Sequence, residues 1–161
     1  MKIKKIKIEN FRLLKDFELD LEDELSLVIG KNNCGKTSLL SILDKFLSHA
    51  EKTKFSFDDF NIEFKNDVKL TVEDLALNEE TYQPIGIKLK LFIEYGEKDN
   101  LSNISKVMMD LDPDNNFIVL GFEYLLDFDG LIRLRKDFAE FKTKEKSKLK
   151  DTKDTNLKTE K

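Results

Sequence analysis

The sequence has almost no cysteine and no long apolar run. Its single cysteine, Cys34, excludes an internal disulfide bond and suits a reducing compartment. No stretch of about 18 consecutive apolar residues is present. The N-terminus, MKIKKIKIENF, alternates polar and apolar residues instead of forming the core of a signal peptide. These absences predict a cytoplasmic protein that does not have a membrane as a partner.

Tryptophan is absent and histidine occurs once, whereas phenylalanine occurs 13 times and charged residues make up 37% of the 161 residues. This length suits one domain with a buried core and a strongly ionic surface. Residues 142–161 contain eight lysines against four acidic residues, a charge of +4 within a total of −4. The acidic remainder does not favour a phosphate backbone, so we expect nucleic acid to be bound only indirectly or through this tail.

The central motif of the chain lies at residues 30–37, GKNNCGKT, which fit the pattern G-x-x-x-x-G-K-[ST] without a mismatch. This motif needs a strand before it and a helix after it. The apolar run in residues 25–29 predicts a buried strand, and apolar residues recur at helical spacing over residues 36–47. Strand, loop and helix together predict a phosphate-binding loop, with ATP and Mg²⁺ as its ligands.

The residue types of the loop match this chemistry. Glycine at positions 30 and 35 lets backbone N–H groups approach phosphate oxygens, and the helix N-terminus adds further donors. Lys36 is expected to reach the β and γ phosphates, and the Thr37 hydroxyl is expected to ligate Mg²⁺. The predicted nucleotide-binding residues of the loop are Gly30, Lys31, Asn32, Asn33, Cys34, Gly35, Lys36, Thr37 and Ser38. Cys34 is either a tolerated variable position or a reactive thiol whose modification blocks the nucleotide.

The rest of the chain predicts many strands and few helices. Alternating residues predict strands in several segments, namely residues 3–8, 17–22, 68–72, 87–95 and 118–126. We expect a turn over residues 12–16, an aromatic connector over 55–60, a loop over 78–86 and a helix over 101–111. Asp129-Gly130 predicts a hairpin that leads into a last strand over residues 131–141.

These elements predict an α/β fold of the P-loop NTPase class with a large antiparallel β component. Two strands precede the strand of the phosphate loop, and hairpins follow its helix, which argues against a simple doubly wound parallel sheet. We expect residues 1–141 to form one lobe. Residues 142–161 are expected to be a frayed end or the start of a helical arm.

Residues 2–43 resemble the opening of the ABC-type ATPase heads of SMC, RecF-like and OLD-family proteins, which belong among AAA ATPase domains. The resemblance rests on a strand, the turn Asn10-Phe11-Arg12, a second strand and the loop at 30–37. It is placed nearest the OLD-family ATP-dependent endonucleases, because the connector at 55–60 and the strand at 87–95 are similar too. It implies an N-terminal lobe that binds ATP and Mg²⁺, dimerises around nucleotide and gates a separate Toprim nuclease in DNA processing or phage defence.

The resemblance also implies that Arg12 contacts a phosphate or the ribose; the alternative is a surface arginine in a turn. Residues for hydrolysis are not found in the sequence. Four apolar residues followed by Asp-Glu occur nowhere, and residues 107–110, VMMD, come closest. The sole histidine, His49, is expected to decorate the end of the first helix, and Gln83 to be a loop residue. No catalytic residue is therefore predicted.

Three functions stay open. The first is an ATP-binding lobe of an OLD- or SMC-like ATPase, completed by a C-terminal lobe, a homologous ATPase or a second copy; the parent protein would hydrolyse ATP and this chain alone would not. The second is a regulatory or adaptor remnant that pairs with a full-length ATPase. The third is a small self-contained NTPase or kinase, in which Asp110 or Asp127 would hold Mg²⁺.

Overall fold

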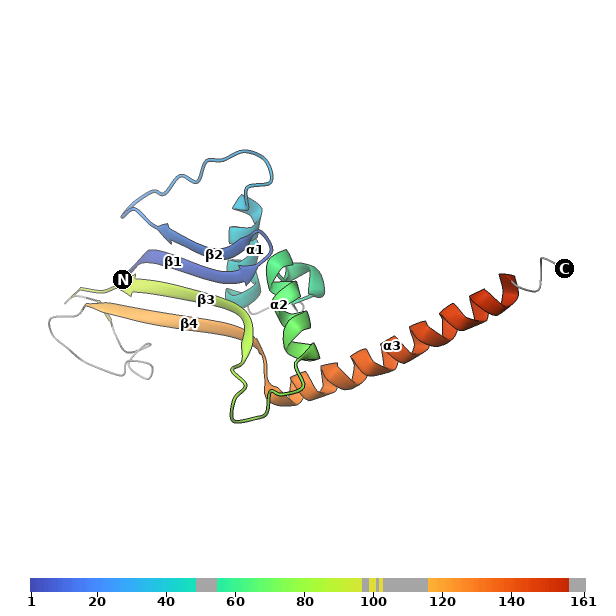
Figure 1. The fold of residues 1–161 in the computed structure, drawn as a ribbon. Helices are drawn as coiled ribbons and strands as arrows, with labels where there is room; N and C mark the ends of the chain where they lie inside the picture. The colour runs from blue at the N-terminus through green and yellow to red at the C-terminus, as the bar shows by residue number, and fades with distance from the viewer. Residues whose placement is uncertain (49–54, 97–98, 101, 103–115, 157–161) are drawn as a thin grey trace. The chain divides into compact units, whose positions relative to one another are not determined.

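The computed structural model describes residues 1–48, 55–96, 99–100, 102 and 116–156, with side chains described as far as residue 145 (Figure 1). The chain divides into two compact units. The first comprises Met1–Asn66 and Gly86–Leu125, and the second comprises Asp67–Ile85 and Leu126–Lys161. Each unit has a cluster of buried apolar residues of its own.

A four-stranded antiparallel sheet in the order β2-β1-β3-β4 runs through the first unit (Figure 1). Its strands are β1 (Lys2–Phe11), β2 (Leu14–Asp20), β3 (Ile85–Glu94) and β4 (Phe117–Leu126). The central strand β1 pairs antiparallel with β2 and β3, so that Ile6 lies opposite Leu19 and Leu91. The strands predicted around residues 3–8, 17–22, 87–95 and 118–126 are confirmed.

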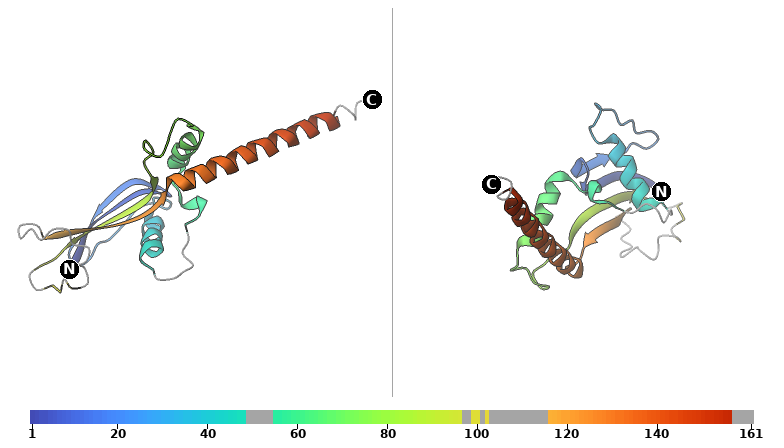
Figure 2. Two further views of the ribbon diagram at one scale, coloured as in Figure 1. Left: turned by 90° about the horizontal axis from the view of Figure 1, so that it is seen from below. Right: turned by 90° about the vertical axis from the view of Figure 1, so that its right-hand side faces the viewer.

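Helix α1 (Lys36–Leu47) covers one face of this sheet (Figure 2). Leu39 and Ile42 are buried, and they belong to the same core cluster as Ile6 and Ile8 of β1. The strand alternation places Ile6 and Ile8 on the covered face, and the spacing of three residues places Leu39 and Ile42 on one side of the helix. Burial of each such side chain stabilises the fold by about 1.5–3 kcal/mol. The helix predicted over residues 36–47 is confirmed.

The turn between β1 and β2 is tighter than the predicted span of 12–16. Asn10 and Arg12 adopt positive φ angles of 64° and 47°, which are unfavourable for residues other than glycine. Hydrogen bonds hold this conformation. Asn10 Nδ2 donates to the Gly86 carbonyl at 2.9 Å, and Asn61 Nδ2 donates to the Arg12 carbonyl at 2.6 Å. The turn is therefore fixed by chain segments far away in sequence.

The segment after α1 contains a short 3-10 helix, η1 (Phe57–Asp59), and helix α2 (Ile62–Glu73). The strand predicted over residues 68–72 is wrong, because this segment is helical. Val68 and Val72 are four residues apart, a spacing that fits one face of a strand and one face of a helix equally well. The Asn61 side chain favours the helix, because its Oδ1 accepts the backbone N–H of Glu63 at 3.0 Å and so caps the start of α2.

The second unit is built from the end of α2, the loop before β3 and helix α3 (Phe128–Asn156). Val72, Tyr82 and Leu131 form its buried cluster. The predicted hairpin at 127–130 and the strand over 131–141 are wrong. The Asp127 carboxylate accepts the backbone N–H of Gly130 at 2.7 Å, and it caps the start of a helix instead of forming a two-residue hairpin turn.

Within the second unit, Arg135 on α3 is hydrogen-bonded to the end of α2. Its guanidinium donates hydrogen bonds to the Val72 carbonyl at 3.3 Å, to the Thr71 and Leu77 carbonyls at 3.4 Å each, and to the Asp74 carbonyl. The last carbonyl groups of a helix have no partner within the helix. Arg135 satisfies two of these in α2, the carbonyls of Thr71 and Val72, whereas the Leu70 carbonyl accepts the backbone N–H of Asp74 at 2.9 Å.

The strand predicted over residues 25–29 is wrong. This segment is irregular, and Leu25, Leu27 and Ile29 are 79%, 77% and 81% exposed. A strand needs a neighbour for its backbone hydrogen bonds, and the described sheet contains only β1 to β4. The helix predicted over 101–111 lies outside the described residues, apart from Ser102. None of the helices in the described parts of the chain is long and apolar enough to cross a membrane.

Candidate functional site

The predicted phosphate loop leads directly into α1, in the first unit. Asn33 and Gly35 adopt positive φ angles of 66° and 96°, and these two residues turn the chain toward the helix. The N–H of Leu39 donates to the Gly35 carbonyl at 3.0 Å, which is the first hydrogen bond of the helix. Gly35 at the N-cap offers no side-chain cap to α1. The first N–H groups of the helix are therefore available to a ligand.

Both glycines of the motif stand where a larger residue would collide. A Cβ on Gly30 would lie 2.5 Å from Cys34 Sγ, inside the loop itself. A Cβ on Gly35 would lie 2.9 Å from Cδ2 of Leu14, at the start of β2, and the φ angle of 96° disfavours any side chain there. The positive φ angle makes glycine the favoured residue at position 35, whereas a larger residue at position 30 would require the Cys34 side chain to move.

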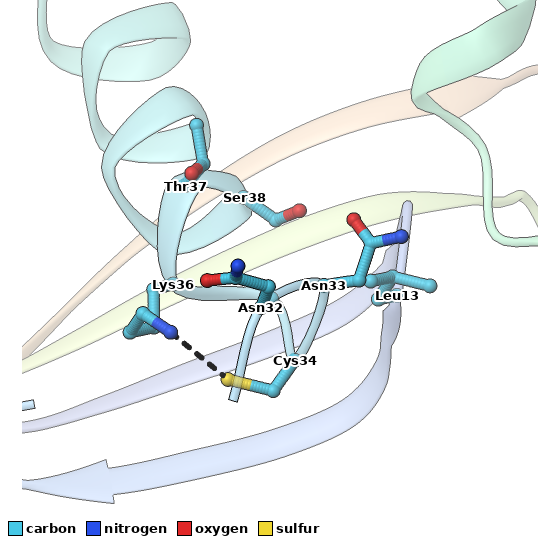
Figure 3. Close-up of a pocket in the computed structure, with 8 residues that line it drawn as sticks. Leu13, Asn32, Asn33, Cys34, Lys36, Thr37 and Ser38 are labelled. Atoms are coloured by element: carbon cyan, nitrogen blue, oxygen red, sulfur yellow. Dashed lines mark hydrogen bonds between the residues drawn. The ribbon is translucent and has the colours of Figure 1, made fainter. Parts of the chain in front are cut away.

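The Lys36 side chain folds back over the loop (Figure 3). Its ammonium group donates to the Lys31 carbonyl at 2.8 Å and to the Gly30 carbonyl, and it lies 3.6 Å from Cys34 Sγ. The positive charge is thus held at the loop by neutral carbonyl groups. A phosphate oxygen would be a stronger partner for it than these carbonyls, because both donor and acceptor would then be charged.

A pocket of ≈ 140 Å³ opens beside the loop (Figure 3). Its lining consists of Leu13, Asn32, Asn33, Cys34, Gly35, Lys36, Thr37 and Ser38. Most of the predicted binding residues therefore surround one space. Thr37 is exposed, whereas Ser38 is buried. Exposed N–H groups, a lysine and a hydroxyl at a helix N-terminus fit a phosphate group.

Arg12, the predicted nucleotide contact outside the loop, is paired with Asp59 of η1. Its Nε and Nη2 lie 3.0 Å and 2.8 Å from the same oxygen, Asp59 Oδ1. Burial by itself raises the pKa of the Asp59 carboxyl, but hydrogen bonds from the Ser56 backbone, Lys45 and Arg12 outweigh it and hold the pKa below its usual value. The role of Arg12 toward a nucleotide stays a prediction.

Asp59 and Asn61 are buried polar residues whose roles the sequence did not reveal. Asp59 closes a capping box with Ser56, and this pattern of a serine followed three residues later by an acid was visible in the sequence. Asp59 is also paired with Arg12, 47 residues away, and no sequence pattern points to that pairing.

The remaining candidates do not join the loop. Gln83 lies in an exposed loop, as predicted, and Asp127 caps α3. His49 and residues 107–110 lie outside the described parts of the chain. Within the residues that the structure describes, no group of three or more His, Cys, Asp or Glu side chains could hold a metal ion.

Two kinds of similarity to known proteins are found, and the first covers the whole chain. The family model described as "AAA ATPase domain" matches residues 1–161. The chain is also similar to the DNA replication and repair protein RecF of Francisella tularensis subsp. novicida (strain U112), with 25% identity over 118 residues. RecF of F. tularensis subsp. holarctica (strain LVS) matches to the same extent. The match covers 73% of this chain, which spans 31% of the length of these relatives.

Proposed function

We propose, since the chain belongs to the family of AAA ATPase domains, that residues 30–38 bind the phosphates of ATP together with Mg²⁺. Membership of this family implies nucleotide binding. The observation that carries the assignment to this loop is the juxtaposition of the Lys36 ammonium group and the uncapped N-terminus of α1 around one pocket. Both features attract anions.

Each residue of the loop has a role in this proposal. The glycines at 30 and 35 keep the backbone accessible, and Lys36 exchanges its carbonyl partners for the β and γ phosphates. The exposed Thr37 hydroxyl ligates Mg²⁺, which neutralises phosphate charge when it is bound. Because no acidic cluster stands among the described residues, the other ligands of the ion would be phosphate oxygens and water.

We further propose that this chain binds ATP without turning it over. The sequence offers no acidic pair for a Walker B strand, and hydrolysis requires such groups around the nucleotide. The similar RecF proteins are named for DNA replication and repair, which supports a role in DNA processing. A place near the OLD family and phage defence is a finer proposal, supported by the connector at 55–60 and the long strand β3.

Mg-ATP is expected to protect Cys34 from a thiol-specific reagent, because Cys34 is exposed and lines the pocket. At an ATP concentration about ten times the Kd, the rate should fall roughly tenfold. Absorbance of the released reagent group measures this rate, and Cys34 is the only thiol in the chain. Adenosine is the matched control, since it lacks phosphates and should give no protection.

Equal rates with ATP, adenosine and buffer would rule out nucleotide binding at this loop. Steady phosphate release by the isolated chain would contradict the proposal that it binds without turnover, and would favour a self-contained NTPase. The Asp127 carboxylate is already used to cap α3, which argues against the version of that alternative in which it holds Mg²⁺.

The exposed apolar segment at residues 25–29 supports the proposal that this chain binds a protein partner. Its leucines and Ile29 are more than three-quarters exposed, although their sequence favours a buried strand. We propose that this segment becomes a strand when strands of another lobe or another chain pair with it. A regulatory remnant that pairs with a full-length ATPase would use the same surface.

Leu27→Lys is expected to reduce self-association of the chain at high concentration, because the charge opposes pairing of an apolar segment. Light scattering after size exclusion measures the mass. Leu75→Lys is the matched control, since Leu75 is 81% exposed, outside this segment, and should leave the mass unchanged. A wild-type chain that is monomeric at all concentrations, or equal effects of the two substitutions, would contradict the use of this segment in pairing two copies of the chain.

A further inference from the structure

Asp59 joins two elements through one buried carboxylate. Its side chain is only 2% exposed. Oδ1 accepts both hydrogen bonds from Arg12 in the β1–β2 turn, whereas Oδ2 lies 3.1 Å from Nζ of Lys45 on α1. Oδ2 also accepts the Ser56 N–H at 2.9 Å. One carboxylate oxygen therefore binds the β1–β2 turn, and the other lies beside α1.

The turn held by Asp59 forms part of the phosphate-loop pocket. Leu13 lines the pocket, and Leu14 packs against Gly35 so closely that a Cβ there would lie 2.9 Å from its Cδ2. Asp59 fixes this turn twice, because its backbone carbonyl also accepts the Arg12 N–H at 2.8 Å. A small displacement of the turn would change the support beneath Gly35.

The second attachment of Asp59 is at the far end of the helix that carries the site. Lys45 lies in the last turn of α1, whose first turn carries Lys36 and Thr37. The side chain of Lys45 is 15% exposed, so this ion pair is largely shielded from water. Asp59 thus contacts both the helix behind the loop and the turn beside it.

A buried ion pair does not in general stabilise a fold better than apolar packing of the same volume. Fixing one arrangement of neighbouring elements is a better-supported use of such a group. We propose that Asp59 is a positioning residue of the nucleotide site, which holds the β1–β2 turn and α1 in register and so sets the conformation of the phosphate loop. This inference rests on the proposed nucleotide binding.

Asp59→Asn keeps the size of the side chain and removes its charge. It is expected to raise the Kd for Mg-ATP about tenfold, because the support of the loop is loosened. Asp58→Asn is the matched control, since Asp58 is the exposed neighbour and should stay within about twofold of wild type. Asp59→Glu restores the charge and is expected to recover part of the affinity.

The rate at which Cys34 reacts with the thiol reagent in the absence of nucleotide is a second readout, because Cys34 lies in the loop and its reactivity depends on the loop's conformation. This rate is expected to change at least about threefold in Asp59→Asn and to stay unchanged in Asp58→Asn. If the wild type binds no ATP, the proposed function fails, and this rate alone then decides whether Asp59 positions the loop. An unchanged Kd and an unchanged rate in folded Asp59→Asn would overturn the inference.

If Asp59→Asn does not fold, Lys45→Met provides the test. It removes one cation from the same carboxylate and leaves the turn and the loop sequence intact. The reaction rate of Cys34 without nucleotide is expected to differ from the wild-type rate by about twofold or more, because the loop is loosened. A wild-type rate in this variant would overturn the link between Asp59 and the loop.

Discussion

Replacing Lys36 by alanine is expected to raise the Kd for Mg-ATP by about 100-fold or more, measured by calorimetric titration. The variant loses the ammonium group that lies over the loop, 2.8 Å from the Lys31 carbonyl. Hydrogen bonds between charged groups contribute roughly 1.5–3 kcal/mol each, and two of them account for a change of this size. The melting temperature should change little, because Lys36 is not part of the core cluster.

The matched control is Lys69→Ala, which removes the same charge from an exposed position on α2. Its Kd should stay within about twofold of wild type. A Lys36→Ala variant that binds as tightly as the Lys69→Ala variant would contradict the assignment of phosphate binding to this loop. It would do so even if ATP binds elsewhere on the chain.

Gly86→Ala is expected to destabilise the first unit by about 3 kcal/mol or more, the upper end of the range for overpacking. An added Cβ would lie 2.1 Å from the Tyr124 carbonyl oxygen and 2.8 Å from Cα of Leu125. Both atoms are backbone atoms of β4, so neither can move without breaking the β3–β4 pairing. Thermal unfolding followed by circular dichroism should show a midpoint lowered by about 6–12 °C.

Gly121→Ala provides the comparison within the same sheet. Gly121 lies on β4, and nothing stands within 4 Å of the position that its Cβ would take. This variant should melt at or slightly above the wild-type temperature, since alanine loses less backbone freedom than glycine on folding. Similar melting temperatures for the two variants would show that the close approach of β4 does not exclude a larger residue than glycine at position 86.

The alternation of polar and apolar residues predicted the sheet well where a strand has one buried face, as in β1 and β3. It failed at residues 68–72, because apolar residues four positions apart satisfy both periods and Asn61 caps a helix before them. It failed again after Asp129-Gly130, where Asp127 uses its carboxylate as a helix cap. The residues at 25–29 have strand propensity but no described neighbour to pair with, and propensity alone does not make a strand.

The candidate site was predictable to the extent that it is local in sequence. The motif at 30–37 specifies its glycines, lysine and helix within eight residues. The pairing of Arg12 with Asp59 depends on how the chain closes, and two residues 47 positions apart leave no periodic signal. The same holds for Gly86, whose close neighbour Tyr124 comes from another strand.

The strand order β2-β1-β3-β4 has a consequence for how the chain folds during synthesis. β1 and β2 form a local hairpin, but the second partner of β1 is β3, which begins only at Ile85. At a synthesis rate of ~5–20 residues per second, the hairpin waits about 3–15 s for that partner. For that interval the free edge of β1 offers Ile6 and Ile8 with unpaired backbone groups. The nascent chain is therefore most exposed to aggregation, and to chaperones, in the interval before β3 is synthesised.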